Sequence, residues 1–312
     1  LSNIMKPLIL KKIKLSLSVA IALAAIALLL KYSANGNTAL EDRSIKPNPQ
    51  RIAVLDYGTL DTFDALGIKA KLAVPKNYMP SYLSKYKSSE YENIGGLKEF
   101  NLESINAFKP DLIVISARQQ DYKNKLEEIA PVYFVKTSVA KDQLAETIKN
   151  IEFFGKLFGV PEKADLAIKD IRADVERTKR KAKENPLRTL VLIANDGKVS
   201  AFGSGSRFGM VHDALGLVQA DPGIKVGRHG QLVNFEYIAE LNPDLILVVD
   251  RSAAIGKSIK NTRVLDNALV GKTNAAKNNR IIKLDPECWY LSGGGIISVK
   301  KMISEVEEAI SK

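Results

Sequence analysis

Cysteine and histidine are scarce in this chain of 312 residues, which contains one Cys and two His. The lone Cys288 cannot form an internal disulfide, and a CxxC metal or redox site is excluded. Only His212 and His229 could take part in histidine-based catalysis. His212 falls in an apolar helical pattern, which favours a packing role. Composition therefore offers little support for an enzyme.

Familiar catalytic and phosphate-binding motifs are also missing. The sequence contains no HExxH and no GxSxG. The Gly-Lys pairs at 256–257 and 271–272 lack the upstream glycine of a phosphate-binding loop, because Arg251 and Asp266 stand at that position. We predict a protein without chemical turnover. A metal-dependent enzyme with duplicated α/β lobes remains the alternative, since catalytic side chains can be far apart in sequence.

The charge balance is basic, with a net charge of +11, while 46% hydrophobic and 26% charged residues are typical of globular proteins. The sequence has no basic stripe interleaved with aromatics, no helix-turn-helix and no zinc signature, so we expect no nucleic-acid partner. The positive excess favours an anionic partner, with a merely solvated basic surface as the alternative.

The first 36 residues have the order of a secretory signal. Lysines precede an apolar run from Leu15 to Leu30, and small polar residues follow it. The run has 16 residues, fewer than the ~20 that span a bilayer comfortably. We predict a signal peptide over residues 1–36 and export to the periplasm, with an uncleaved anchor on a sensory or structural domain as the alternative. No Cys stands close after the run, so a lipid anchor on cysteine is not expected.

One stretch occurs twice, at residues 101–118 and 234–251, with eight of 18 positions identical. Each copy has an Asn that can cap a short helix, a Glu in the first helical turn, and a Pro-Asp-Leu-Ile sequence that leads into an apolar strand. An Arg follows each strand. A duplicated αβ unit predicts two similar lobes.

Short apolar segments alternate with helical segments around both copies, which predicts an α/β fold of two Rossmann-like lobes with mainly parallel sheets. A mostly polar helical stretch from Glu162 to Glu184 lies between the copies, as expected for a helix that bridges two domains. We predict a first lobe over residues 37–160, a bridging helix over 161–184 and a second lobe over 185–312, with a ligand cleft between the lobes.

Three arginines are candidates for this cleft. Arg118 and Arg251 stand just past the buried strand of each repeat, and ligands of open α/β sheets bind outside the carboxyl ends of the strands. Arg207 lies on a glycine-rich turn, residues 201–209, that we expect on the same rim. Converging guanidinium groups suit a multiply anionic ligand, although a single Arg is as readily paired with a surface acid.

His229 and Tyr290 are the candidate metal ligands, because an imidazole nitrogen and a phenolate oxygen can both bind Fe(III). Both fall in segments that we expect to be loops of the second lobe. The alternatives are a solvent-exposed histidine and an aromatic that packs beside Trp289.

The two lobes, the bridging helix and the repeated N-x-E…PDLI unit resemble the class III substrate-binding proteins of ABC importers over residues 50–312, and most closely their ferric-catecholate subgroup. The resemblance implies a monomeric periplasmic receptor that captures a ferric siderophore and delivers it to the permease dimer of an importer. Iron would enter as part of the ligand, with no permanently bound cofactor. Binding of haem, cobalamin or a hydroxamate siderophore by the same fold is the nearest alternative.

Individual positions match the motifs of this subgroup. By resemblance, Arg118, Arg207 and Arg251 hold the trianionic iron–catecholate centre. His229 and Tyr290 complete the iron coordination when the siderophore is tetradentate.

Each repeat also carries one glutamate at the start of its helix, Glu103 in the first copy and Glu236 in the second. The family uses one such surface Glu per lobe to dock on arginines of the permease, so the resemblance assigns these two residues to permease docking.

Overall fold

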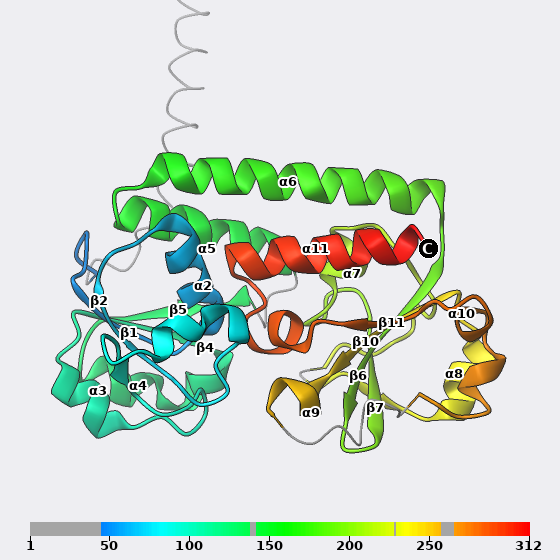
Figure 1. Ribbon diagram of the computed structural model, residues 1–312, viewed down its shortest axis with the longest axis horizontal. Helices are drawn as coiled ribbons and strands as arrows, with labels where there is room; N and C mark the ends of the chain where they lie inside the picture. Colours follow the sequence, from blue (N-terminus) through cyan, green and yellow to red (C-terminus); the bar gives the residue numbers. More distant parts are fainter. Residues whose placement is uncertain (1–44, 138–141, 228, 257–264) are drawn as a thin grey trace, which may run out of the picture. The chain divides into compact units, whose positions relative to one another are not determined.

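The computed structural model describes residues 45–137, 142–227, 229–256 and 265–312, and the predicted signal peptide, residues 1–36, lies outside them. Within Ile45–Lys312, two β-sheets lie side by side, and one long helix extends over both (Figure 1). Among the described residues, no helix is both long enough and apolar enough to cross a membrane.

The first sheet is wholly parallel, with the strand order β3-β2-β1-β4-β5. Its strands are β1 (Arg51–Val54), β2 (Lys71–Val74), β3 (Glu92–Asn93), β4 (Leu112–Ser116) and β5 (Val132–Val135). The chain leaves β1 toward β2 on one side and returns to β4 on the other. Ligand sites of such sheets lie at this switch, beyond the carboxyl ends of the strands.

The second sheet has the order β11-β10-β6-β7-β9, with β8 also paired to β6. Its strands are β6 (Arg188–Asn195), β7 (Lys198–Phe202), β8 (Val218–Gln219), β9 (Gln231–Val233), β10 (Leu245–Asp250) and β11 (Ile281–Leu284). Strands β8, β6, β10 and β11 pair in parallel, whereas β7 pairs antiparallel with β6 and with β9. The predicted α/β fold with two lobes is confirmed, and the second sheet adds an antiparallel edge that we did not predict from the sequence.

Helices connect and cover these strands. The α-helices are α2 (Tyr57–Leu66), α3 (Leu102–Phe108), α4 (Lys123–Glu127), α5 (Gln143–Leu157), α6 (Pro161–Glu184), α7 (Met210–Asp213), α8 (Phe235–Leu241), α9 (Arg251–Ala254), α10 (Asn274–Lys277) and α11 (Ile296–Ile310). Shorter helical turns of 3₁₀ or π type are η1 (Ser81–Lys87), η2 (Ala117–Tyr122), η5 (Val270–Lys272) and η6 (Glu287–Leu291).

The repeated sequence folds into the same unit in both lobes. Asn101 caps α3 by accepting a hydrogen bond from Ser104 N at 3.0 Å, and Asn234 caps α8 by accepting one from Tyr237 N at 2.8 Å. The identical Pro-Asp pair also has a role, because Asp111 accepts hydrogen bonds from the backbone of the neighbouring strand β1. Asp244 accepts the equivalent hydrogen bond from Arg188 N in the second lobe, so both copies keep the same cap and the same contact to a neighbouring strand.

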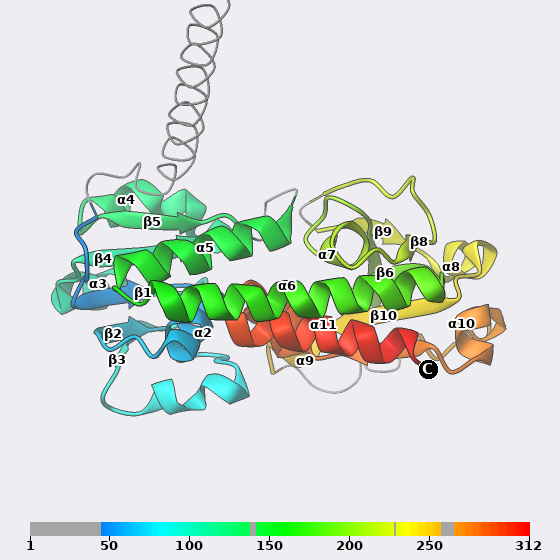
Figure 2. The same cartoon turned by 90° about the horizontal axis from the view of Figure 1, so that it is seen from above.

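The helix predicted between the repeats is α6, and the C-terminal helix α11 runs beside it (Figure 2). Glu307 of α11 forms ion pairs with Arg177 at 3.0 Å and Lys181 at 2.7 Å on α6. Hydrogen bonds from these two cations lower the pKa of Glu307 to about 2. The first turn of α11 also contacts Asp61 of α2 in the first lobe. The lobes are therefore linked by α6 through the chain and by α11 through packing, and the sequence did not reveal this second connection.

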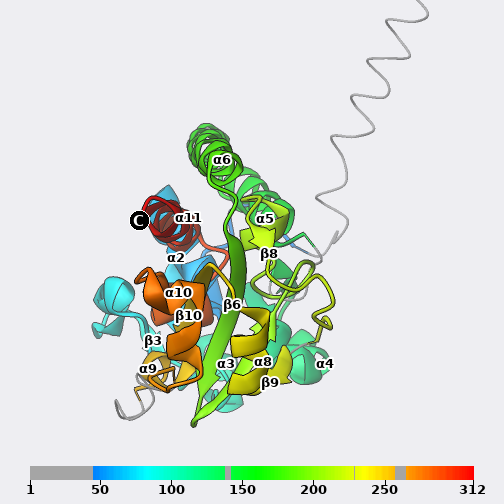
Figure 3. The same ribbon diagram turned by 90° about the vertical axis from the view of Figure 1, so that its right-hand side faces the viewer.

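Alternate residues of the central strands face different cores, as the twofold repeat of a strand requires. Ile52 and Val54 of β1 and Val191 and Ile193 of β6 join one large cluster with residues of α2, α5, α6 and α11. The residues between them face smaller clusters under α3 or α8, and Figure 3 shows α6 and α8 at opposite ends of the second lobe. Both lobes thus share one hydrophobic core, which fixes the strand ends that face each other.

Candidate functional site

Two of the three candidate arginines lie at strand ends, as the repeat predicted, and the third lies in a turn. Arg118 is in η2 directly after β4, and Arg251 is the first residue of α9 directly after β10. Arg207 lies in the turn between β7 and α7. One arginine comes from the first lobe and two come from the second, and all three side chains are partly buried.

All three guanidinium groups converge on Tyr290. Arg118 Nη2 donates to the Tyr290 carbonyl oxygen at 2.6 Å, and Arg207 Nη2 donates to the same oxygen. Arg251 donates from Nε to the Tyr290 hydroxyl at 2.8 Å and from Nη1 to Asn195 Oδ1 at 2.6 Å. The three guanidinium carbons lie 5.8, 4.5 and 5.6 Å from the centre of the Tyr290 ring, within the range of cation–π attraction.

Tyr290 does not lie in a loop, and this expectation from the sequence was wrong. It belongs to the π-helical turn η6, which a hydrogen bond from Ser292 N to the Glu287 carbonyl closes at 3.1 Å. Single π-turns occur often at functional sites. The Tyr290 carbonyl stands at the end of this turn, where helical carbonyls lack a partner within the helix, so it is available to the arginines.

Positive charge dominates the electrostatics of this cluster. Burial and the neighbouring Arg118 charge lower the pKa of Arg207 to about 9, so its guanidinium is protonated at neutral pH in an unfavourable environment. Burial would raise the pKa of the Tyr290 phenol, but the hydrogen bond from Arg251 and the charges of all three arginines outweigh it, and the pKa is lowered. A negative oxygen is thus favoured at this position.

A cleft of about 1130 Å³, counting the open space at its mouth, surrounds the cluster and brings all five candidate ligand and metal residues together. His229 lies in its wall, exposed to solvent. Three further polar side chains that the sequence analysis missed also line it, Lys98 of the first lobe and Asn195 and Ser200 of the second. Asn195 ends β6, so the strand-end rule that identified Arg118 could have found it, whereas no pattern marks Lys98. None of the described residues that line this cleft is acidic.

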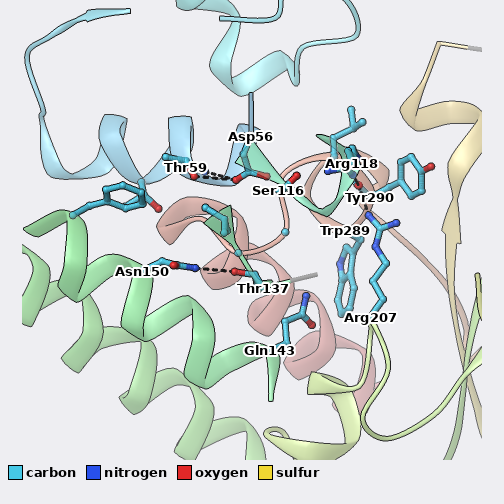
Figure 4. A pocket seen from close by; sticks show the side chains of 16 residues that line it. Asp56, Thr59, Ser116, Arg118, Thr137, Gln143, Asn150, Arg207, Trp289 and Tyr290 are labelled. Atoms are coloured by element: carbon cyan, nitrogen blue, oxygen red, sulfur yellow. Dashed lines mark hydrogen bonds between the residues drawn. The ribbon is translucent and has the colours of Figure 1, made fainter. Parts of the chain in front are cut away.

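An enclosed pocket lies behind the arginines, at the carboxyl ends of the first-lobe strands (Figure 4). Arg118, Arg207 and Tyr290 stand at one end of it, and polar side chains line much of the remainder. Asp56 there caps α2 by accepting a hydrogen bond from Thr59 N at 2.8 Å. The arginines therefore separate the open cleft from a polar interior.

The two glutamates assigned to permease docking are both exposed, in the first turns of equivalent helices. Glu103 lies in α3 and Glu236 in α8. Because each follows an Asn cap, its carboxylate lies near the positive end of the helix dipole. The two lobes thus offer similar acidic positions on their surfaces.

Comparison with known proteins gives consistent matches over most of the chain. The petrobactin-binding protein YclQ of Bacillus subtilis (strain 168) is 41% identical over 273 residues, which cover 86% of this chain and 84% of that protein. Its crystal structure superposes with a TM-score of 0.83 at 38% identity, covering 86% of this chain and 94% of that one.

Two relatives from Vibrio extend the comparison. The ferric-anguibactin-binding protein FatB of Vibrio anguillarum is 31% identical over 276 residues, 87% of this chain and 84% of that protein. The crystal structure of the periplasmic catecholate-siderophore binding protein VctP from Vibrio cholerae matches with a TM-score of 0.79 at 33% identity, covering 85% and 95% of the two chains. A family model described as "Periplasmic binding protein" matches residues 52–288. By this match and these relatives, the chain belongs to the periplasmic binding protein family.

Proposed function

We propose that this protein captures a ferric catecholate-type siderophore between its lobes and delivers it to the permease of an ABC importer. The observation that carries the proposal is the position of Tyr290, whose phenolic oxygen accepts a hydrogen bond from Arg251 while its ring lies within 6 Å of three guanidinium carbons. A catecholate offers the same chemistry, an aromatic ring with negatively charged oxygens. Relatives named for petrobactin, anguibactin and catecholate siderophores support the ligand class.

Charge complementarity favours an anionic iron complex over a neutral one. The cleft has three arginines and Lys98 along its walls, and its described lining residues include no acid. Each charge-assisted hydrogen bond between a guanidinium and a catecholate oxygen contributes about 1.5–3 kcal/mol. A neutral hydroxamate complex would leave these cations without a counter-charge, which is unfavourable when they are partly buried.

Iron would come with the ligand rather than stay on the protein. We infer that His229 and Tyr290 coordinate Fe(III) directly when a tetradentate siderophore leaves positions open. The lowered pKa of Tyr290 supports this role, because a phenol must lose its proton to bind iron. The exposed position of His229 in the cleft wall lets its ring approach a bound complex.

Delivery requires a partner in the membrane. We infer that Glu103 and Glu236 dock on arginines of a permease dimer, one from each lobe of a monomeric receptor. Lobes spanning residues 37–160 and 185–312, joined through 161–184, would present these two acids together. A periplasmic location fits the family, and the mass of the exported chain would test the predicted cleavage after residue 36.

Fluorescence titration provides the direct test. Trp289 is the single tryptophan and precedes Tyr290, so an Fe(III)–catecholate complex in the cleft should quench its emission. We expect saturation at micromolar concentration or below, and weaker binding of a ferric hydroxamate, haem or cobalamin at equal concentration. Absence of quenching by the catecholate complex, or tighter binding of one of these alternatives, would refute the proposed ligand.

A further inference from the structure

The π-helical turn η6 belongs to the second lobe by sequence, yet the first lobe holds it at both ends. Before Tyr290, the Oε2 atom of Glu287 accepts hydrogen bonds from Ser81 N at 2.8 Å and Ser81 Oγ at 2.7 Å. After Tyr290, Ser292 Oγ lies 2.6 Å from the hydroxyl oxygen of Tyr82. Ser81 and Tyr82 are adjacent residues at the start of η1.

Asp61 of α2 connects the same region to the helix that follows the turn. Its Oδ2 accepts a hydrogen bond from the Tyr82 hydroxyl at 2.9 Å. Its two carboxylate oxygens also accept from Ile297 N and Ser298 N, both at 2.7 Å. These amides lie in the first turn of α11, where backbone N–H groups lack partners within the helix. A first-lobe carboxylate therefore caps the C-terminal helix.

The contact is closely packed. Asp61 is completely buried, and a Cβ atom added at Gly295 would lie 2.4 Å from its Cγ atom. A Cβ atom at Gly58 of α2 would lie 3.0 Å from the Ser292 carbonyl oxygen. Because a side chain on either glycine would force neighbouring atoms to shift, the segment after η6 packs tightly against α2.

The charge of Asp61 also bears on this contact. Burial raises the pKa of Asp61 to about 6, and its hydrogen bonds with Ile297, Ser298 and Tyr82 offset only part of that effect. At neutral pH the group is therefore mainly a carboxylate, which accepts from the two amides of α11 and from Tyr82. Charged acceptors form stronger hydrogen bonds than neutral ones.

We propose that Asp61, Ser81 and Tyr82 form a turn clamp, a set of positioning residues that hold η6 on the first lobe and so set the spacing of the arginines in the cleft. None of the three lines that cleft. The turn clamp rests on the proposed function only for its expected effect on ligand affinity.

The geometry at Tyr290 shows why the position of the turn matters. Its carbonyl oxygen is the point where Arg118 of the first lobe and Arg207 of the second meet. A displacement of η6 by about 1 Å would break hydrogen bonds of this length, since donor–acceptor contacts beyond ~3.5 Å contribute little. The arginines would then lose both their common acceptor and their contact with the Tyr290 ring.

Tyr82→Phe tests the turn clamp, because it removes one hydroxyl and keeps the ring. The first readout is the ultraviolet titration of Tyr290, obtained by subtracting the same titration of a Tyr290→Phe variant, and it needs no ligand. We expect the Tyr290 pKa to rise toward its ordinary value in the Tyr82→Phe protein. The second readout is affinity for the Fe(III)–catecholate complex, which should weaken about 10-fold, the equivalent of one charge-assisted hydrogen bond.

Tyr237→Phe is the matched control, since it removes a tyrosine hydroxyl that donates to Asp221 at 2.5 Å elsewhere in the second lobe. It should lower stability comparably and leave both readouts at the parent's values. Ser81→Ala, which deletes only one contact to Glu287, should shift both readouts in the same direction as Tyr82→Phe but less.

Two results would have different meanings. If Tyr82→Phe lowers stability alone, with the Tyr290 titration and the affinity unchanged, Tyr82 is merely structural and the turn clamp is wrong. If the parent protein binds no ferric catecholate, the proposed function fails, and the Tyr290 titration still decides the turn clamp.

Discussion

Replacing Arg207 with methionine should change stability and binding in opposite directions. The substitution keeps a long side chain and removes a charge that is partly buried beside Arg118, the environment that lowers the pKa of Arg207 from its ordinary value to about 9. At ~1.4 kcal/mol per pKa unit, this environment disfavours the charged form by ~5 kcal/mol. Removing this unfavourable charge should stabilise the folded state of the ligand-free variant.

The variant also loses favourable contacts. Arg207 donates to the Tyr290 carbonyl and lies 4.5 Å from the Tyr290 ring and 5.4 Å from the Phe208 ring. Together these contribute ~3 kcal/mol. The carbonyl keeps Arg118 as a donor, so no buried acceptor is left unpaired. We therefore expect the free energy of unfolding to rise by ~1–2 kcal/mol.

Binding should weaken, because a charge-assisted contact worth about 1.5–3 kcal/mol to the ligand is lost. That loss corresponds to an affinity for the Fe(III)–catecholate complex that is about 10- to 150-fold lower. Denaturant unfolding and Trp289 fluorescence quenching measure the two quantities on the same samples. Both effects come from one uncompensated charge in the cleft.

Arg188→Met provides the control. Arg188 begins β6, at the end of the strand away from the cleft, and donates to the backbone carbonyls of Leu241 and Asn242. Its replacement should lower stability and leave affinity unchanged. If Arg207→Met is destabilised as Arg188→Met is, or binds the complex as the parent does, the cleft does not hold excess positive charge for a ligand.

Three further outcomes are expected. The double variant His229→Ala/Tyr290→Phe should lose the charge-transfer absorption of a bound tetradentate ferric complex, whereas an unchanged spectrum would exclude direct coordination. Charge reversal at Glu103 and Glu236 should abolish stimulation of the permease ATPase in reconstituted vesicles without changing siderophore affinity, and full stimulation would exclude these residues from docking. Glu307, whose pKa is lowered to about 2, contributes stability above its unfolded pKa that is lost as the pH falls toward 2. Glu307→Gln should thus remove about 1 kcal/mol from the free energy of unfolding at neutral pH and only a small part of that near pH 2, a difference that acid unfolding curves measure.

Most of the local structure follows directly from sequence patterns. The Asn caps and the apolar runs of the two repeats fold as expected, and Arg118 and Arg251 lie at the strand ends where the repeat placed them. Caps and strand periodicity depend on residues a few positions apart, so a linear reading captures them. The antiparallel edge of the second sheet was missed although the sequence carries a signal for it. Asp196-Gly197 forms the two-residue hairpin turn between β6 and β7, with both residues at positive φ, and Asp-Gly is a common sequence for such turns.

The candidate site depends on contacts between distant segments. No local pattern shows that Tyr290 lies in a π-helical turn. Nor does any local pattern show that its carbonyl oxygen accepts a hydrogen bond from Arg118, which lies 172 positions earlier in the chain. Lys98 escaped notice for the same reason, since only the packing of the two lobes brings it to the cleft. Such proximity is set by the common hydrophobic core and not by sequence spacing.

By itself, the sequence determined the two lobes, the connecting helix and the arginines that follow the two repeated strands, because duplication, periodicity and capping are local properties of the chain. Only the tertiary structure decided that the arginines surround one phenolic ring, that α11 forms a second link between the lobes, and that Asp61 and Tyr82 hold the turn that carries the ring. These features arise when segments far apart in sequence pack on one core, and that packing sets the distances on which binding depends.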